Sequence, residues 1–158
     1  MDYIFEDFFA GFLAERLNKQ WKVEYQKSEK YLATNEAGRN AFNMQHDIFL
    51  TSRDNPGLKI IVDTKYKLSD LNFKNDLKKG IVQGDLYQMV SYAFRRGCTE
   101  IMLVFANLTE EINSPDKFEI HSGFFPYEKI NVTAIEISFW SMTNFECLAA
   151  EMERVISV

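Results

Sequence analysis

The stretch from Asn43 to Lys67 constrains the fold most, because two apolar segments there flank a strong turn signal. Met44–Ser52 is typical of a strand, Arg53–Gly57 (RDNPG) of a turn, and Leu58–Lys67 of a second strand. The turn would join the two strands as an antiparallel hairpin. The β-branched run of the second strand leads directly into Asp63-Thr64-Lys65. Charged groups are costly in a core, so this sequence indicates a functional site.

The geometry of a strand brings these charges together. Side chains alternate along a strand, so Asp63 and Lys65 share one face and lie roughly 7 Å apart along it. The turn can bring Asp47, on the preceding strand, opposite them. Two carboxylates and one ammonium at one point suit a hard divalent cation and a water molecule. The alternative is a salt bridge at the edge of the sheet with no catalytic role.

A second D-x-K motif competes with the first. Asp76-Leu77-Lys78 has the same pattern but lies in a polar segment, where solubility alone explains it. Asp63 differs because it ends an apolar strand and has a second acid, Asp47, one hairpin earlier. We therefore expect Asp63, rather than Asp76, to belong to the site.

The helix that follows has two candidate Gln–Tyr pairs. Gln88 and Tyr92 lie four residues apart, on the helix face that also carries Asp85. Gln83 and Tyr87 have the same spacing. Both pairs flank the apolar stripe of the helix, on opposite sides, so periodicity does not choose between them.

The remaining pattern predicts an α/β fold, with helices packed on the faces of a sheet. Helical spacing of apolar residues predicts helices over 2–19, 81–96 and 144–156, the second of which Gly97 would end. Further strands are expected over 21–25, 30–34, 100–106, 117–123 and 132–139, with loops over 35–40, 68–80 and 107–115.

Composition limits the class of protein. The 158 residues are 46% hydrophobic and 15% aromatic, which excludes disorder and fits one domain. No segment has the length of a membrane span, and no signal peptide is recognised. The two cysteines are far apart, which favours a reducing cytoplasm and argues against zinc or iron–sulfur sites. We expect a cytoplasmic protein with no membrane contact.

The distribution of charge is uneven. The net charge is −5, yet residues 59–96 carry eight Lys and Arg against four Asp. These cations are either ordinary solvated side chains or a phosphate-facing patch beside the proposed metal site.

The combination of motifs carries a family resemblance. Asp47, then Asp63-Thr64-Lys65, then Gln88-x-x-x-Tyr92 resembles the PD-(D/E)XK nuclease superfamily and its RecB-like branch. The segments FEDFF, VDTKYK and DLYQMVSYA resemble the nuclease domain of the McrC family, the cleaving subunits of GTP-dependent restriction systems directed at methylated cytosine. The resemblance implies a restriction-endonuclease-like core (αβββαβ) with extra C-terminal strands and a helix. It also implies that residues 1–158 form a single endonuclease domain.

The resemblance assigns roles to individual residues. It implies that Asp47, Asp63 and the Thr64 carbonyl bind Mg²⁺, for which Mn²⁺ can substitute. Lys65 would hold and help deprotonate the attacking water, or neutralise the transition state. Glu6 would contact the metal directly or through water, although an ordinary first-turn acid is an equal alternative.

The resemblance also selects Gln88 and Tyr92 over the other pair, to orient the lysine, the water or the DNA backbone. His46 departs from the superfamily, which often has proline there, and we interpret it as structural or exposed. The chain has neither the His motif nor the four-cysteine cluster of some RecB-like relatives.

Partners follow from the same resemblance. DNA would be the substrate, and a McrB-type AAA+ GTPase would activate cleavage. The sequence has no G-x-x-x-x-G-K-[ST] loop and no match to the GTPase-docking region of McrC proteins, which indicates an excised nuclease domain or a shorter relative. Self-association is a hypothesis, because a double-strand break needs two active sites. Two alternatives stay open: a stand-alone RecB-like DNA nuclease of repair or defence, and an inactive adapter with a nuclease fold.

Overall fold

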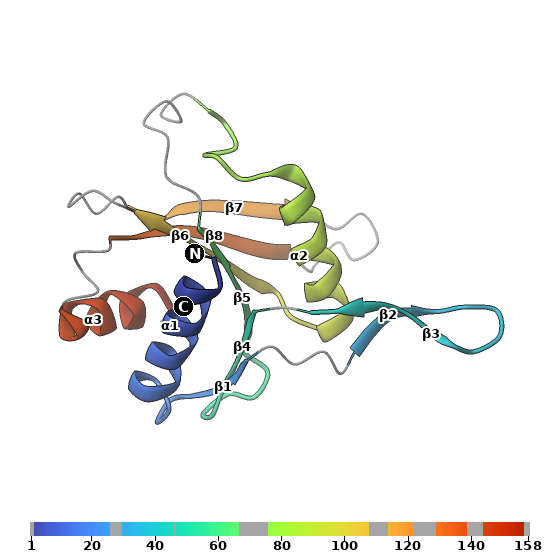
Figure 1. Ribbon diagram of the computed structural model, residues 1–158, viewed down its shortest axis with the longest axis horizontal. Coiled ribbons are helices and arrows are strands. Elements are labelled where there is room, and N and C mark those ends of the chain that lie inside the picture. Colours follow the sequence, from blue (N-terminus) through green and yellow to red (C-terminus); the bar gives the residue numbers. More distant parts are fainter. Residues whose placement is uncertain are drawn as a thin grey trace.

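A six-stranded mixed sheet forms the centre of the molecule, with helices on both faces (Figure 1). The computed structural model describes residues 2–25, 30–45, 47–66, 76–107, 114–121, 129–138 and 144–156. The strand order is β1-β4-β5-β6-β8-β7. The strands are β1 (Trp21–Tyr25), β4 (Ile48–Ser52), β5 (Lys59–Lys65), β6 (Glu100–Asn107), β7 (Asp116–His121) and β8 (Lys129–Ser138).

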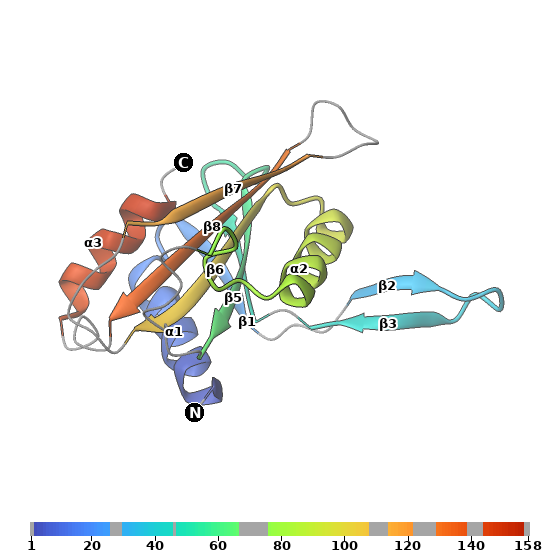
Figure 2. The ribbon, with the colours of Figure 1, turned by 90° about the horizontal axis from the view of Figure 1, so that it is seen from above.

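The helices divide between the two faces of this sheet. Helices α1 (Asp2–Arg16) and α3 (Phe145–Ile156) lie on one face, and α2 (Gln83–Arg96) lies on the other (Figure 2). Each face has its own buried cluster of apolar side chains. Alternation along β5 serves both clusters, because Ile60 and Val62 pack with α1, and Ile61 packs with α2. The expected α/β arrangement is therefore present.

The hairpin at the centre of the sequence forms as expected. β4 and β5 pair antiparallel, with Ile48 opposite Val62 and Leu50 opposite Ile60. The amide of Leu58 donates to the Asn55 carbonyl over 2.8 Å, which closes the turn. The second strand ends at Lys65, and Lys67, where we expected its end, lies outside the described residues.

Helix α2 connects two parallel strands. β5 and β6 pair in parallel, so the chain must cross from one end of the sheet to the other, and α2 makes that crossover. The helix ends where we expected, since Gly97 adopts the left-handed conformation at φ 59°. The amide of Cys98 then donates to the Ala93 carbonyl over 2.9 Å, which completes the helix terminus.

One predicted strand was wrong. Instead of a single strand over Met44–Ser52, the chain forms β3 (Asn40–Met44), breaks, and begins β4 at Ile48. β3 pairs with β2 (Lys30–Thr34) in a separate two-stranded hairpin that projects away from the main sheet (Figure 1). The physical reason is a change of partner: residues before the break pair with β2, and those after it pair with β1 and β5. His46, which we interpreted as structural or exposed, lies outside the described residues.

The remaining boundaries differ from the predictions by a few residues at most. The expected C-terminal strands and helix are present as β7, β8 and α3. Residues 67–75 and 108–113, within two of the expected loops, lie outside the described residues. Among the described residues, no helix combines the length and hydrophobicity needed to span a membrane.

Candidate functional site

The candidate site lies at the end of β5, on the face covered by α2. Asp63 and Lys65 alternate with Thr64 and so share the strand face of Ile61. Ile61 packs with Met89, whose helix therefore covers this face. The expectation that Asp63 and Lys65 share a face is confirmed.

Asp47 lies immediately before β4, where the hairpin register continues toward Asp63. Its Oδ2 accepts two hydrogen bonds from Thr64, one from the amide over 2.8 Å and one from Oγ1 over 3.0 Å. Asp47 is thereby the acceptor for the Thr64 amide, beyond the last β4–β5 pair, Ile48 and Val62. The structure brings Asp47 beside the end of β5, as the sequence predicted.

Lys65 and Asp63 form a close ion pair. The Lys65 Nζ lies 2.8 Å from Asp63 Oδ2, and the Asp63 side chain is 10% exposed. Burial, followed by the negative charge of Asp47, raises the pKa of Asp63 to about 6, although Lys65 opposes the change. Burial lowers the pKa of Lys65, but the contact with Asp63 and the charges of Asp85 and Asp47 outweigh it, so the net pKa is raised.

The first turns of α2 contribute to the same electrostatic site. Asp85 acts on the pKa of both Asp63 and Lys65, and so lies within electrostatic range of the ion pair. An acid in the first turn of a helix is stabilised by the helix dipole. The sequence alone places Asp85 on the helix face of Gln88 and Tyr92 and assigns it no role in the site. Its electrostatic effect on the ion pair depends on how α2 packs, which the sequence does not reveal.

The two Gln–Tyr pairs of α2 differ in burial. Gln88 Nε2 donates to the Tyr92 hydroxyl over 2.8 Å, and Tyr92 is 8% exposed within the apolar cluster under α2. Gln83 also donates to Tyr87, but Tyr87 is 61% exposed. Tyr92 therefore packs against the sheet and Tyr87 is at the surface. This distinction was not available from helical periodicity.

The competing D-x-K motif has a structural role. Asp76 Oδ1 accepts a hydrogen bond from the Lys78 amide, and Oδ2 accepts one from the Gly80 amide, each over 3.0 Å. These two bonds, that of Gly80 first, lower the pKa of Asp76. The carboxylate thus closes the turn before α2 and explains the second motif without catalysis.

Acidic side chains also meet on the α1 side of the sheet. The Tyr25 hydroxyl donates to Asp7 Oδ1. Burial first, then this hydrogen bond and the charges of Glu6, Asp7 and Asp47, raise the pKa of Tyr25. Sequence reasoning missed Tyr25, because a tyrosine at a strand end has no distinguishing pattern.

The donor set fits a hard cation bound by few protein ligands. Asp63 Oδ2 is buried and accepts no hydrogen bond of regular geometry, its polar contact among the described residues being the Lys65 ammonium. Mg²⁺ accepts carboxylate oxygens and retains several waters, so two carboxylates suffice. Glu6 is buried on α1, and its contact with the metal, direct or through water, stays a prediction. The described residues contain no group of three or more His, Cys, Asp or Glu that could hold a metal.

The fold and site define a mixed α/β protein in which a buried acid–lysine pair ends a central strand beside a second carboxylate. The family described as McrBC 5-methylcytosine restriction system component matches residues 1–106. This match spans the site and most of the chain. The chain therefore belongs to the family of McrBC restriction system components.

A solved structure has the same fold. It is the refined half-complex from the tetradecameric assembly of Thermococcus gammatolerans McrB AAA+ hexamers with bound McrC. The match has a TM-score of 0.61 and 17% sequence identity, and it covers 98% of this chain. The present chain spans only 33% of the length of the matched chain. Among curated proteins, none matches this sequence.

Proposed function

We propose that this chain is the Mg²⁺-dependent DNA endonuclease domain of a McrBC-type restriction system. The observation that carries the proposal is the convergence of Asp47, Asp63 and Lys65 at one end of β5, in a chain that belongs to the McrBC family. A buried carboxylate with a raised pKa, such as Asp63, destabilises the folded chain when it is ionised. Groups with perturbed pKa values of this kind are concentrated at functional sites.

Asp47, Asp63 and the Thr64 carbonyl would hold the metal. When bound, Mg²⁺ supplies Lewis acidity to a phosphoryl oxygen and lowers the pKa of a bound water. Asp47 and Thr64 are already joined by two hydrogen bonds, which would hold these two proposed ligands together before the metal binds. A rigid ligand set reduces the reorganisation needed at the moment of reaction.

Lys65 would position the attacking water and offset the charge of the transition state. Its raised pKa keeps the ammonium protonated at neutral pH in the absence of metal. A cation bound at Asp63 would compete with this ammonium for the same oxygen, and Lys65 would then turn toward the substrate phosphate. Gln88 and Tyr92, joined by a hydrogen bond, would orient the water or the phosphate from α2.

We propose that a McrB-type AAA+ GTPase activates the domain, as the matched structure contains McrC with McrB AAA+ hexamers. The test combines the chain with a cognate GTPase, GTP, Mg²⁺ and methylcytosine-containing DNA. Cleavage should need all of these components and should be lost by at least 100-fold in Asp63→Asn.

The matched control is Asp76→Asn, which changes the other D-x-K motif and should keep full cleavage. Loss of cleavage in both variants would point to misfolding, and loss in Asp76→Asn alone would reject the assignment. Cleavage by the chain alone with Mg²⁺ would favour a stand-alone nuclease. No cleavage under any condition, together with no Mg²⁺ binding, would favour an inactive adapter.

A further inference from the structure

The hairpin of β2 and β3 stands outside the main sheet, and we call residues 30–44 the ribbon. Figures 1 and 2 both show it projecting from the body of the molecule beside α2. Residues 31–40, 42 and 43 are all exposed. A two-stranded hairpin has little stability of its own in water. The ribbon therefore adds little to the core of the fold, and its surface is open to a ligand.

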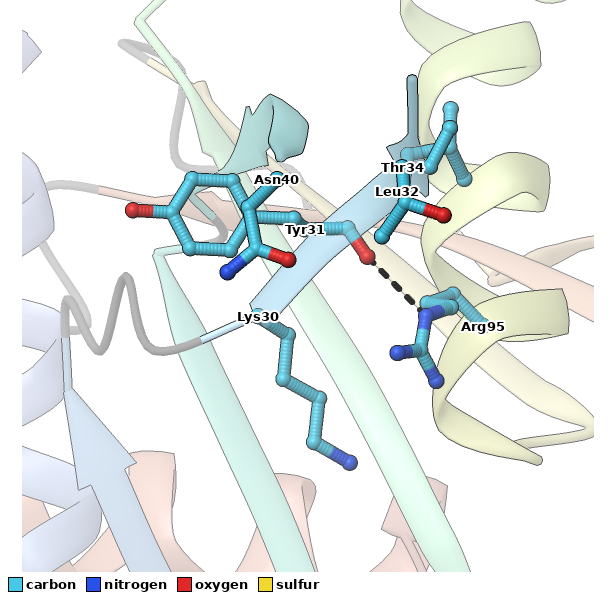
Figure 3. A pocket seen from close by; sticks show the side chains of 7 residues that line it. Lys30, Tyr31, Leu32, Thr34, Asn40 and Arg95 are labelled. Carbon is cyan, nitrogen blue, oxygen red and sulfur yellow. Dashed lines mark hydrogen bonds between the residues drawn. The ribbon is translucent and has the colours of Figure 1, made fainter. Parts of the chain in front are cut away.

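The ribbon is nevertheless held in one shape at its tip and at its base. At the tip, the Asn35 amide donates to the Arg39 carbonyl over 2.9 Å, and the Arg39 amide donates to Asn35 Oδ1 over 2.9 Å. At the base, Met44 is buried in the apolar cluster under α2. Arg95 Nε donates to the Tyr31 carbonyl over 2.9 Å, the dashed line in Figure 3. A ribbon fixed in this way loses little freedom when it binds.

Phe42, in the middle of β3, is unfavourable to the fold. Its φ is 59°, in the left-handed region that bulky residues rarely adopt. Its side chain is 74% exposed, so burial offsets little of this strain. Leu32 lies opposite it in the β2–β3 register and is 39% exposed. Strained residues are concentrated at functional sites, and the strain at Phe42 indicates that this part of the ribbon binds a ligand.

The ribbon leads directly into the candidate site. β3 ends at Met44, and Asp47 follows three residues later. Five residues separate Phe42 from Asp47, and an extended chain of that length spans at most about 18 Å. Base pairs of duplex DNA rise 3.4 Å each, so this span equals about five of them. A duplex held at Asp47 is thus close enough to be contacted by the ribbon at the same time.

The dimensions and chemistry of the ribbon fit duplex DNA. The major groove of B-form DNA admits a two-stranded β-ribbon, and phenylalanine and asparagine are among the side chains that contact base edges there. The exposed side chains of the ribbon include Thr34, Asn35, Asn40, Phe42 and Asn43. Its charged residues are Lys30, Arg39 and Glu36, which give a net charge of +1 in a chain of net charge −5. This sign suits a polyanion.

We propose that the ribbon enters the major groove of the DNA duplex within about five base pairs of the cleaved phosphate, with Phe42 against the base edges. This inference rests on the proposed nuclease function, because it takes the end of β5 as the point of cleavage. It assigns β2 and β3 to substrate binding rather than to catalysis.

The test measures binding of a labelled 30-base-pair duplex, with Ca²⁺ in place of Mg²⁺ so that the DNA stays intact. Phe42→Gly removes the ring and suits the left-handed backbone. It should raise the Kd for duplex about tenfold, while its melting temperature equals or exceeds that of the unmodified chain. The matched control is Phe94→Ala, which removes a ring that is 70% exposed near the end of α2. Its Kd should stay within twofold.

A second duplex tests the groove. Its cytosines are replaced by glucosylated 5-hydroxymethylcytosine, whose sugar lies in the major groove because substituents at C5 of a pyrimidine project there. The unmodified chain should bind this duplex at least tenfold more weakly than the plain one. Equal affinity for the two duplexes would overturn the assignment to the major groove.

Other outcomes also overturn the proposal. A melting temperature of Phe42→Gly far below that of the unmodified chain would make Phe42 a structural residue. Equal weakening in Phe94→Ala, or no binding of duplex by the unmodified chain at 50 mM salt, would show that the ribbon does not hold DNA. If Phe42→Gly weakens binding to a GTPase hexamer while its Kd for duplex is unchanged, the ribbon is a protein contact.

The binding measurement needs no cleavage, so its failure is distinct from that of the nuclease assignment. Loss of cleavage in Asp63→Asn, with unchanged duplex binding in Phe42→Gly, would reject the ribbon and keep the nuclease. Weakened duplex binding in Phe42→Gly, with full cleavage in Asp63→Asn, would support the ribbon and reject the catalytic site at Asp63.

Discussion

At the scale of single residues, Asp63 combines a place in the candidate site with an energetic cost to the folded state. Its pKa is raised from 3.8 to about 6, so the ionised form is disfavoured in the folded chain. Below pH 4 Asp63 is protonated in both the folded and the unfolded chain, so the difference in its pKa has no effect on stability. Above pH 6 Asp63 is ionised in both. The folded state therefore loses stability as the pH rises from 4 to 6, by on the order of 3 kcal/mol.

The Asp63→Asn variant should escape this loss. At pH 8 we expect it to melt at or above the temperature of the unmodified chain, with the unpaired Lys65 offsetting part of the gain. At pH 4 the two should melt within about 1 °C of each other. Thermal denaturation followed by circular dichroism at both pH values measures this. A variant that melts far lower at pH 8 would identify the ion pair as structural, which is the alternative stated for these residues.

The two Gln–Tyr pairs on α2 offer a matched comparison. Gln88→Ala removes the hydrogen-bond partner of Tyr92, which packs against the sheet. Gln83→Ala removes the partner of Tyr87, which lies at the surface. We expect Gln88→Ala to lower the cleavage rate about 10- to 100-fold, with the melting temperature changed little because Gln88 itself is exposed.

Gln83→Ala should leave the rate within twofold, as measured by single-turnover cleavage. A larger effect in Gln83→Ala than in Gln88→Ala would show that the wrong pair was selected.

At the scale of elements, the C-terminus of α2 can be tested with its glycines. Gly97 has φ 59°, and a side chain there would be strained although the space is open. Gly97→Ala should lower the free energy of unfolding by about 1 kcal/mol. Gly84, inside the same helix with open space around it, is the control, and Gly84→Ala should raise that free energy by about 0.5–1 kcal/mol.

Urea denaturation measures both values. Both substitutions replace glycine by alanine, so changes of opposite sign in the free energy of unfolding would identify the backbone conformation as the cause. Destabilisation of equal size in both would contradict the left-handed terminus.

Elements were largely predictable where the local pattern determined them. The apolar run of β5, the turn before it and the Gly97 helix stop each depend on residues close in sequence. The break between β3 and β4 did not, since residues 45–47 (QHD) contain neither Gly nor Pro, and both flanking segments suit a strand. Only the change of strand partner ends β3, and such pairing is a property of the folded chain.

The candidate site was predictable to the same extent. Alternation placed Asp63 and Lys65 on one face, and the hairpin placed Asp47 near them. Thr64 differs, because its amide and hydroxyl bond to Asp47 while the proposed role was for its carbonyl, which stays a prediction. Tyr25 and Asp85 come within electrostatic range of the site's acids through the packing of separate elements, so no spacing in the sequence indicates them.

At the scale of the whole molecule, metal binding should appear as added stability. A ligand that binds only the folded state stabilises it by RT ln(1 + [L]/Kd). With a Kd near 1 mM, 10 mM Mg²⁺ would raise the free energy of unfolding by about 1.4 kcal/mol. We expect this increase at pH 8 in the unmodified chain and its loss in Asp47→Asn and Asp63→Asn.

Thermal melts with and without Mg²⁺ measure the effect. At pH 5, where Asp63 is largely protonated, the increase should be smaller, because the proton and the metal compete for one carboxylate. An Mg²⁺ effect of equal size in the Asp63→Asn variant would place the metal elsewhere on the chain.

The pairing of β8 along the full length of β6 has a consequence for any shortened version of this chain. Residues 100–105 have register partners on both β5 and β8, and residues 106 and 107 have partners on β8. A truncation after residue 107 would leave β6 with a row of open amides and carbonyls beside an apolar surface. Exposed edges of this kind recruit other chains, so such a fragment should precipitate or form fibrils instead of folding as the full chain does. Strand β8 thus protects the edge of β6 from pairing with other chains.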